Sequence, residues 1–209
     1  MISLIIPAYY ANQELVETTA RCLYSLHTTD WPDEVILVDD GSPIEPEFQF
    51  ETIDVRLPEN QGYSAATNIG LEASTGDVII IGNNDLTFPK NWLRELLRPL
   101  EEGFDVSCCW SSDQKFKIEP VIKEADKFGS LFAMRRSVYE DIGGFDEQFR
   151  GYFSDDDYRQ RLKQKGYRIG KNHLLVVGHV AKATYSVTDP EDNEYKKARL
   201  LYEVKWGLE

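Results

Sequence analysis

The sequence predicts an α/β fold, in which a mixed, mostly parallel central sheet is flanked by helices. In the first half of the chain, short β-branched segments alternate with helical segments, as βαβ units do. The links between them are short, so the strands are expected to be parallel and covered on both faces. A composition of 42% hydrophobic and 28% charged residues is that of a soluble globular protein.

The first predicted strand is Ser3–Ile6, an apolar segment that Pro7 is expected to end. A helix over Gln13–Leu26 follows, because apolar residues recur there at helical spacing and Asn12 is a suitable N-cap. Further strands and helices continue the alternation. They are expected at Glu34–Val38 (strand), Thr52–Arg56 (strand), Tyr63–Ala73 (helix), Val78–Ile81 (strand) and Asn91–Leu100 (helix).

The second half of the chain is less regular, but it still mixes both kinds of element. Its predicted elements are strands at Phe104–Trp110, Ser130–Met134 and Tyr167–Val177, and helices at Arg136–Ile142, Ser154–Lys165 and Glu191–Trp206. Because 209 residues fit one domain, we expect a single domain over residues 1–209. It comprises a front half (1–100), a back half (101–188) and a terminal helical segment (189–209).

Composition excludes several functional classes. The net charge of −13 argues against nucleic acid or an anionic membrane as partner, since both require a basic surface. Three cysteines, two of them adjacent, suggest no disulfide framework and favour a reducing compartment. The N-terminus does not have the pattern of a signal peptide, and no apolar run is long enough for a membrane span. We therefore expect a cytoplasmic protein.

Acidic and amide side chains follow two of the predicted strands, in "VDDGS" (38–42) and "GNND" (82–85). Such residues are common in turns, so a purely structural role is one interpretation. Ligands of α/β proteins, however, bind at the carboxyl ends of strands. Neither GxGxxG nor GxxxxGK[ST] is present. Because hard oxygen ligands suit Mg²⁺ or Mn²⁺, these strand ends predict a metal-bridged phosphate ligand.

Five stretches together resemble the family-2 glycosyltransferases of GT-A fold. They are "LIIPAYY", "VILVDDGS", "NQGYSAATNIGLEASTGDVIIIGNND", "GSLFAMRRSVYEDIGGFDEQFRGYFSDDDYRQRL" and "GYRI…VVGH", in the family's order from Ser3 to His179. The resemblance implies a Rossmann-like GT-A domain that transfers a sugar from a nucleoside-diphosphate sugar to a hydroxyl of a glycan or other acceptor. It assigns the nucleotide to residues 1–100, and the acceptor and catalysis to residues 101–188.

For the nucleotide, the resemblance implies that Pro7, Ala8 and Tyr9 pack against the base, with Tyr9 as the stacking ring. The family usually has Asn at the next position, where this chain has Tyr10, and both tyrosines could instead be ordinary core or rim aromatics. Asp39 would receive the N–H of the base. A carboxylate only accepts hydrogen bonds, so it fits a base that donates a ring N–H, as uracil does, and this favours a UDP-sugar.

Further nucleotide contacts are implied for Asn60, Gly62 and Asn68, although the first two also read as an ordinary cap and turn. Asn83 and Asn84 occupy the first two positions of the family's DxD motif. Asn83 replaces an aspartate there, as in members that resemble rhamnosyltransferases. It keeps an acceptor oxygen but lowers the charge of the site.

Asp85 and His179 are the implied ligands of Mn²⁺ or Mg²⁺. Asp85 ends the DxD-like triplet, and His179 follows the predicted strand that ends at Val177. A neutral imidazole is a good ligand for Mn²⁺, but a single histidine is also common in a structural role.

The implied catalytic residues are Asp155 and Asp156, within "FSDDDY". Asp155 matches the family's general base, and Ser154 stands where a glutamate is usual. Mutual repulsion among adjacent carboxylates should raise at least one pKa, as a base requires. Helix capping by Ser154 and Asp157, together with the helix dipole, is the structural alternative.

Two other classes compete with a metal-assisted, inverting glycosyltransferase. A nucleotidyltransferase should carry a glycine-rich basic loop after the first strand, and "PAYYANQE" contains no glycine, lysine or arginine. A non-catalytic nucleotide-sugar-binding module would explain Asn83 and Ser154, which replace expected acids. The terminal helix could cover the core, dimerise or join a further domain of a longer chain.

Overall fold

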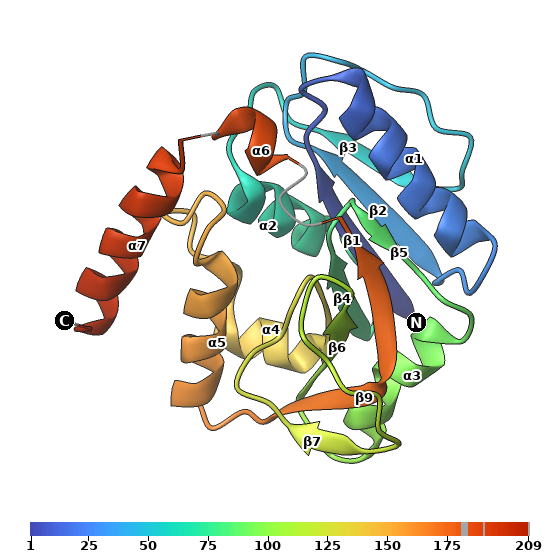
Figure 1. The fold of residues 1–209 in the computed structure, drawn as a ribbon, viewed down its shortest axis with the longest axis vertical. Helices are drawn as coiled ribbons and strands as arrows, with labels where there is room; N and C mark the ends of the chain where they lie inside the picture. The colour runs from blue at the N-terminus through green and yellow to red at the C-terminus, as the bar shows by residue number, and fades with distance from the viewer. Residues whose placement is uncertain (181–183, 190, 209) are drawn as a thin grey trace.

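The computed structural model describes residues 1–180, 184–189 and 191–208, apart from the side chains of residues 185 and 186 (Figure 1). The described residues form a nine-stranded sheet in the order β3-β2-β1-β4-β8-β6-β9-β5, and β7 pairs with β9. Strands β1, β2, β3, β4, β6 and β9 run in one direction, and β5, β7 and β8 run against them. The predicted mixed, mostly parallel sheet is confirmed.

The front half follows the predicted alternation closely. Strands β3, β2, β1 and β4 are neighbours in parallel register, so their carboxyl ends meet at one edge of the sheet. Asn12 caps the first helix as expected, because its Oδ1 accepts a hydrogen bond from Leu15 N at 3.0 Å. The elements are β1 (Ile2–Ala8), α1 (Gln13–His27), β2 (Glu34–Asp39), β3 (Ile53–Arg56), α2 (Tyr63–Ala73) and β4 (Val78–Gly82).

Pro7 does not end the first strand, contrary to the expectation from sequence. Strand β1 continues to Ala8, and Pro7 pairs with Val38 of β2. The pairing of β1 with β4 has already ended at Ile5, opposite Ile81. Proline is tolerated because one side of the strand is unpaired at this point. The extension carries Pro7 and Ala8 to the edge of the sheet where the other parallel strands end.

The chain from residue 86 onwards contains the remaining predicted elements and three short ones that were not predicted from sequence. Strands β5 and β7 and helix α6 are only two to four residues long, too short to show a hydrophobic period. The terminal helix begins two residues later than expected, and residues 190 and 209 lie outside the described residues. The elements are β5 (Leu86–Thr87), α3 (Trp92–Glu101), β6 (Val106–Ser111), β7 (Ile122–Glu124), β8 (Leu131–Arg135), α4 (Arg136–Ile142), α5 (Ser154–Gln164), β9 (Ile169–His179), α6 (Tyr185–Thr188) and α7 (Asn193–Trp206).

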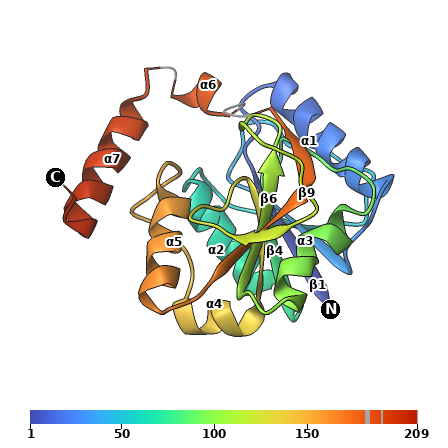
Figure 2. The same ribbon diagram turned by 60° about the horizontal axis from the view of Figure 1, so that its bottom comes forward.

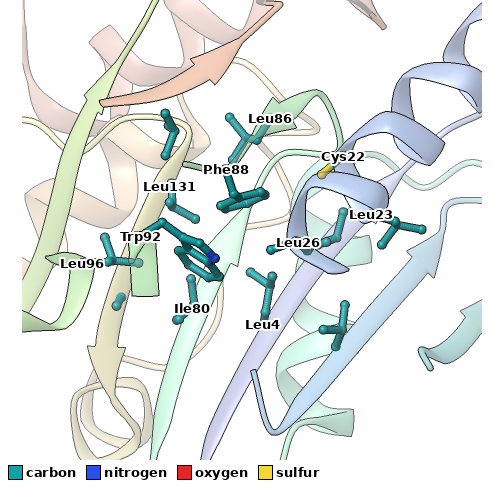
Figure 3. Close-up of a cluster of buried hydrophobic side chains, with 14 of the residues drawn as sticks. Leu4, Cys22, Leu23, Leu26, Ile80, Leu86, Phe88, Trp92, Leu96 and Leu131 are labelled. Atoms are coloured by element: carbon teal, nitrogen blue, oxygen red, sulfur yellow. The ribbon is translucent and has the colours of Figure 1, made fainter. Parts of the chain in front are cut away.

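The sheet separates two hydrophobic cores. Alternate residues of a strand point to opposite faces, so Leu4 and Ile6 pack towards α1 and α3, whereas Ile5 packs towards α2 and α5. Figure 3 shows the first core, in which Leu4 and Ile80 of the sheet cluster with Leu26 of α1 and Trp92 of α3. Both faces are thus covered, and the ends of the strands remain for binding. No helix among the described residues combines the length and the hydrophobicity that crossing a membrane requires.

Helix α7 stands outside α5 at the margin of the molecule (Figures 1 and 2). The side chain of Asp157 on α5 is fully buried and joins the two helices. Its Oδ1 lies 2.6 Å from Lys205 Nζ and accepts a hydrogen bond from Trp206 Nε1 at 3.1 Å, while its Oδ2 accepts one from Arg161 at 3.1 Å. Asp157 therefore has a structural role, but not the capping role that the sequence suggested.

The N-cap of α5 is Phe153, in the left-handed region at φ 64°, and it makes no side-chain capping bond. Ser154 is already inside the helix, and its hydroxyl donates to Gly151 O at 2.6 Å. The capping box expected from Ser154 and Asp157 is therefore not formed. Asp157 is left free to face α7.

The Asp157→Asn substitution is expected to lower the free energy of unfolding by about 2 kcal/mol, because it removes a buried acceptor of charged hydrogen bonds. A change of this size lowers Tm by about 4–8 °C in a protein of this length. Thermal denaturation followed by circular dichroism measures it. Glu203→Gln on α7 is the control, since its pair with Arg199 is exposed and should be nearly neutral. Equal Tm values for the two variants would contradict the anchoring role of Asp157.

Candidate active site

A cleft of about 1180 Å³ lies at the carboxyl ends of β1 and β4, and its walls include the start of α5 and one side of α7. The parallel register of these strands explains its position, because ligand crevices of α/β sheets form where such strands end. Most of the residues singled out from sequence meet in it. They are Pro7, Ala8, Tyr9, Asn60, Gly62, Asn83, Asn84, Asp85, Asp155, Asp156 and His179.

Asp39 and Asn68 are the two predicted nucleotide contacts that do not line the cleft. The Asp39 carboxylate is bound by the Arg56 guanidinium and accepts a hydrogen bond from Ser42 N at 2.9 Å. Asn68 lies on α2, and its side chain both donates to Phe145 O at 3.0 Å and accepts from Phe145 N at 2.7 Å. In this structure both side chains are used to join neighbouring segments.

The two adjacent tyrosines after β1 have different environments. Tyr9 is partly exposed and lines the cleft. Tyr10 is only 1% exposed and packs edge-on against Phe48, with the ring centroids 5.9 Å apart. Of the pair, Tyr9 is therefore the ring that can meet a base, and Tyr10 belongs to the core.

The loop before α2 is held against β2 by Asp40, which belongs to the "VDDGS" stretch. Its carboxylate accepts hydrogen bonds from Gln61 N at 2.7 Å and Gly62 N at 2.8 Å. Burial raises the pKa of Asp40, and these two hydrogen bonds oppose the rise. Gly62 has φ 97°, and a Cβ there would lie 2.6 Å from Arg150 O. Only glycine fits this close approach.

The turn after β4 places Asn83, Asn84 and Asp85 at the bottom of the cleft. Asn84 is buried and donates to Thr19 Oγ1 on α1 at 2.8 Å, which fixes the turn. Asn83 Nδ2 lies 3.3 Å from Nε2 of His179. The amide of Asn84 is thus structural, whereas that of Asn83 faces the imidazole.

His179 and Asp85 form the centre of the cleft. His179 Nε2 lies 3.2 Å from Asp85 Oδ1, and its Nδ1 lies 2.9 Å from Asp113 Oδ1. If Asn83 donates to Nε2, the ring proton must be on Nδ1, where Asp113 accepts it. Burial lowers the pKa of His179, but its contacts with Asp85 and Asp113 outweigh burial, and the pKa is raised overall.

This arrangement fits a divalent cation. Asp85 Oδ1 is buried and makes no hydrogen bond to any described residue, although His179 lies close to it. A histidine that donates one ring N–H to a carboxylate, and presents the other nitrogen to a metal, is the common protein arrangement. No group of three or more His, Cys, Asp or Glu side chains suited to a metal occurs in the described part of the chain. Asp85 and His179 would therefore share an ion with oxygens from a ligand.

Asp155 and Asp156 lie in the first turn of α5, and their side chains have different surroundings. Asp156 is paired with Arg159 at 3.0 Å. Asp155 lines the cleft and keeps part of its surface exposed there. The surrounding protein nevertheless desolvates its carboxyl group, and this is the main cause that raises the pKa of Asp155 to about 6; repulsion from Asp156 is the second. A carboxylate with such a pKa is suited to accept a proton near neutral pH.

The cleft residues that were not predicted from sequence include Asp113 and a second group in the terminal segment, besides others within 127–132 and 148–153. Asp113 follows β6, so the rule that identified Asp85 at a strand end could also have found it. The second group comes from the terminal segment, and no local pattern reveals that it reaches the cleft. Its members are Thr184, Thr188, Asp189, Glu194, Tyr195, Lys197, Ala198 and Leu201.

Solved structures of similar fold include proteins that were crystallised with UDP bound. GalNAc-T7, solved with UDP, GalNAc and Mn²⁺, superposes with a TM-score of 0.71 at 17% identity, over 86% of this chain and 43% of that one. S. aureus TarS 1–349, solved with UDP, gives 0.68 at 17% identity, over 97% and 64% of the two chains. The shared architecture defines a GT-A domain, and the GT-A fold expected from sequence is confirmed.

Over residues 3–174 the chain matches Glycosyl transferase family 2, and it belongs to that family. Two curated relatives are undecaprenyl-phosphate 4-deoxy-4-formamido-L-arabinose transferases. The protein of Pseudomonas syringae pv. syringae (strain B728a) is 32% identical over 50% of this chain and 34% of its own, and that of Proteus mirabilis (strain HI4320) is 31% identical over 50% and 35%. The chain thus spans about a third of the length of these relatives.

Proposed function

We propose that the chain is a glycosyltransferase domain that moves a sugar from a nucleoside-diphosphate sugar, with a UDP-sugar favoured, to an acceptor hydroxyl. The observation that carries the proposal is the presence in one cleft of a cation-binding pair, Asp85 and His179, and an exposed carboxylate of raised pKa, Asp155. Tyr9 at the same strand edge supplies a ring for the base. The similar proteins solved with UDP support the choice of nucleotide.

Each residue has a distinct part in the proposed reaction. Asp85 and His179 would hold Mn²⁺ or Mg²⁺, which when bound would offset the charge of the leaving diphosphate. Asp155 accepts the proton of the acceptor hydroxyl while the oxygen of that hydroxyl forms a bond to the anomeric carbon. The bond from that carbon to the diphosphate breaks, and its electron pair leaves with the nucleotide. Attack from the face opposite the leaving group inverts the anomeric centre.

The competing classes are less well supported. Membership of Glycosyl transferase family 2 argues against a nucleotidyltransferase. A non-catalytic binding module would have no use for a carboxylate whose pKa the cleft raises, as it does for Asp155. Slow hydrolysis of a UDP-sugar in the absence of an acceptor distinguishes an enzyme from a module. The expected cytoplasmic location and the single-domain organisation stay predictions.

Calorimetric titration of UDP, GDP, CDP and dTDP, with and without Mn²⁺, tests the proposal. We expect UDP to bind most tightly, and its affinity to rise at least tenfold when Mn²⁺ is present, because the cation screens the diphosphate from Asp85. The rise should disappear in the presence of excess EDTA. Equal affinity for all four nucleotides, or no response to Mn²⁺, would refute the assignment of donor and cation.

A further inference from the structure

The wall of the cleft beside Asp155 is aromatic and is shared by two segments. Tyr152 and Phe153 immediately precede α5, and Tyr195 comes from the first turns of α7. The ring of Tyr195 lies 5.3 Å from that of Tyr152, at 89°, and 5.4 Å from that of Phe153, at 41°. All three rings line the cleft, and Tyr195 is 38% exposed. An aromatic surface therefore lies within a few residues of the proposed base.

The position of this surface is fixed by the fold. Phe153 has φ 64°, an unusual and costly conformation for a bulky residue. Its ring contacts Tyr202 of α7 as well, with the centroids 5.2 Å apart. The opposite end of the helix is held through Asp157, which binds Lys205 and Trp206. Two separate contacts thus hold α7 where Tyr195 forms part of the cleft.

The charge of the same wall is negative. Within residues 152–159 and 184–201, the charged residues that line the cleft are Asp155, Asp156, Asp189 and Glu194, with Arg159 and Lys197 as cations. Both of these cations are already paired, Arg159 with Asp156 at 3.0 Å and Lys197 with Glu194 at 2.7 Å. Arg150 and Lys127 also line the cleft, and Arg150 donates a hydrogen bond to Asn60 Oδ1 at 2.8 Å. The Asp189 carboxylate accepts hydrogen bonds from the backbone N–H groups of Asn193 and Glu194, at the start of α7. A phosphate placed against this part of α5 and α7 would meet four carboxylates and two cations that already have carboxylate partners.

A phosphate acceptor and a sugar-hydroxyl acceptor also differ in whether they need a general base. A phosphate monoester has its second pKa near 6, so at neutral pH its oxygen attacks with no proton to lose. A sugar hydroxyl is neutral and must lose a proton as it attacks. Asp155, open to the cleft beside Tyr195 and Phe153, is placed to accept that proton.

We infer that the acceptor is a neutral sugar, whose ring packs on the surface formed by Tyr152, Phe153 and Tyr195 and whose hydroxyl meets Asp155. This inference rests on the proposed function and deepens it. Aromatic rings attract the apolar face of a sugar ring without any need for charge. The curated relatives are named for undecaprenyl phosphate, and the acceptor wall of this chain is unsuited to such an anion. Tyr195 is then a residue that determines acceptor affinity.

The test first selects a donor, by hydrolysis of UDP-glucose, UDP-galactose and UDP-N-acetylglucosamine without an acceptor. With that donor, transfer is measured to a panel of p-nitrophenyl pyranosides and to farnesyl phosphate, a short polyprenyl phosphate. We expect transfer to at least one pyranoside and none to farnesyl phosphate. If no donor is hydrolysed and no UDP binds, the proposed function fails. Hydrolysis with transfer only to farnesyl phosphate, or to neither class, overturns this inference alone.

Variants of Tyr195 complete the test. Tyr195→Ala should raise the KM for the pyranoside about tenfold, the size expected for loss of an aromatic contact, and leave the KM for the donor within twofold. Tyr195→Phe keeps the ring and should behave like the unmodified protein. Leu200→Ala on the same helix is the matched control, because Leu200 is 63% exposed and outside the cleft. An unchanged acceptor KM in the folded Tyr195→Ala protein overturns the role of Tyr195.

Discussion

Asp155→Asn is expected to lower kcat for sugar transfer by about 10²- to 10⁴-fold, the usual contribution of a general base. The dissociation constant of UDP should stay within about twofold, because Asp155 lies at the start of α5, whereas Tyr9, Asn83 and Asp85, which would hold the nucleotide and its cation, follow β1 and β4. Transfer kinetics and calorimetry on the same preparation give both quantities. The contrast between them identifies loss of a base rather than loss of the fold.

The control for this substitution is Asp141→Asn, at the end of α4. Asp141 is an exposed carboxylate paired with Lys165, and it is not among the residues of the cleft. It carries the same change of charge and should leave kcat unaltered. Transfer by Asp155→Asn at the unmodified rate would show that another group accepts the proton.

The pH dependence of transfer follows from the same residue. The base acts as a carboxylate, and the pKa of Asp155 is raised to about 6. Transfer should therefore be constant well above pH 6 and fall tenfold per unit below it. Desolvation is the main cause of the raised pKa and repulsion from Asp156 the second, so Asp156→Asn should move the fall to lower pH. A pH profile that is the same in Asp155→Asn, in Asp156→Asn and in the unmodified protein would exclude Asp155 as the titrating group.

Much of this site could be predicted from sequence, because strand ends obey a local rule. Asn83, Asn84 and Asp85 follow a β-branched run, and parallel register carries them to the same edge as Pro7, Ala8 and Tyr9. That geometry is encoded by the hydrophobic pattern of each strand and needs no further information. The rule would also have found Asp113, which follows β6 in the same way.

Other features depend on packing between distant segments, which no local pattern encodes. Asp39 is at a strand end, yet Arg56 of the neighbouring strand takes its carboxylate. Asn68 has a suitable position in sequence, but its side chain bonds with the backbone of Phe145. Tyr195 reaches the cleft only because α7 is anchored to α5. The partners of Asp39 and Asn68 lie 17 and 77 residues away, and they cannot be assigned from spacing alone.

Asp85→Asn is expected to reduce kcat/KM for transfer by about a hundredfold to a thousandfold, since charge stabilisation by a bound cation is worth several kcal/mol. Asn keeps one acceptor oxygen and nearly the same shape but removes the negative charge. Apart from its contact with His179, Oδ1 of Asp85 has no partner among the described residues, so the substitution should cost little stability. Calorimetry should show that UDP affinity no longer responds to Mn²⁺.

Asp113→Asn provides a graded comparison, because Asp113 touches the Nδ1 side of His179 rather than the side that faces Asp85. Removal of such an outer carboxylate typically weakens metal affinity 10- to 100-fold without abolishing it. The Mn²⁺ concentration for half-maximal transfer should therefore rise in Asp113→Asn, and saturating Mn²⁺ should restore most of the rate. Asp85→Asn should not recover at any Mn²⁺ concentration. Full recovery of Asp85→Asn by Mn²⁺, or a Mn²⁺ response of UDP binding that survives the substitution, would show that the cation binds elsewhere.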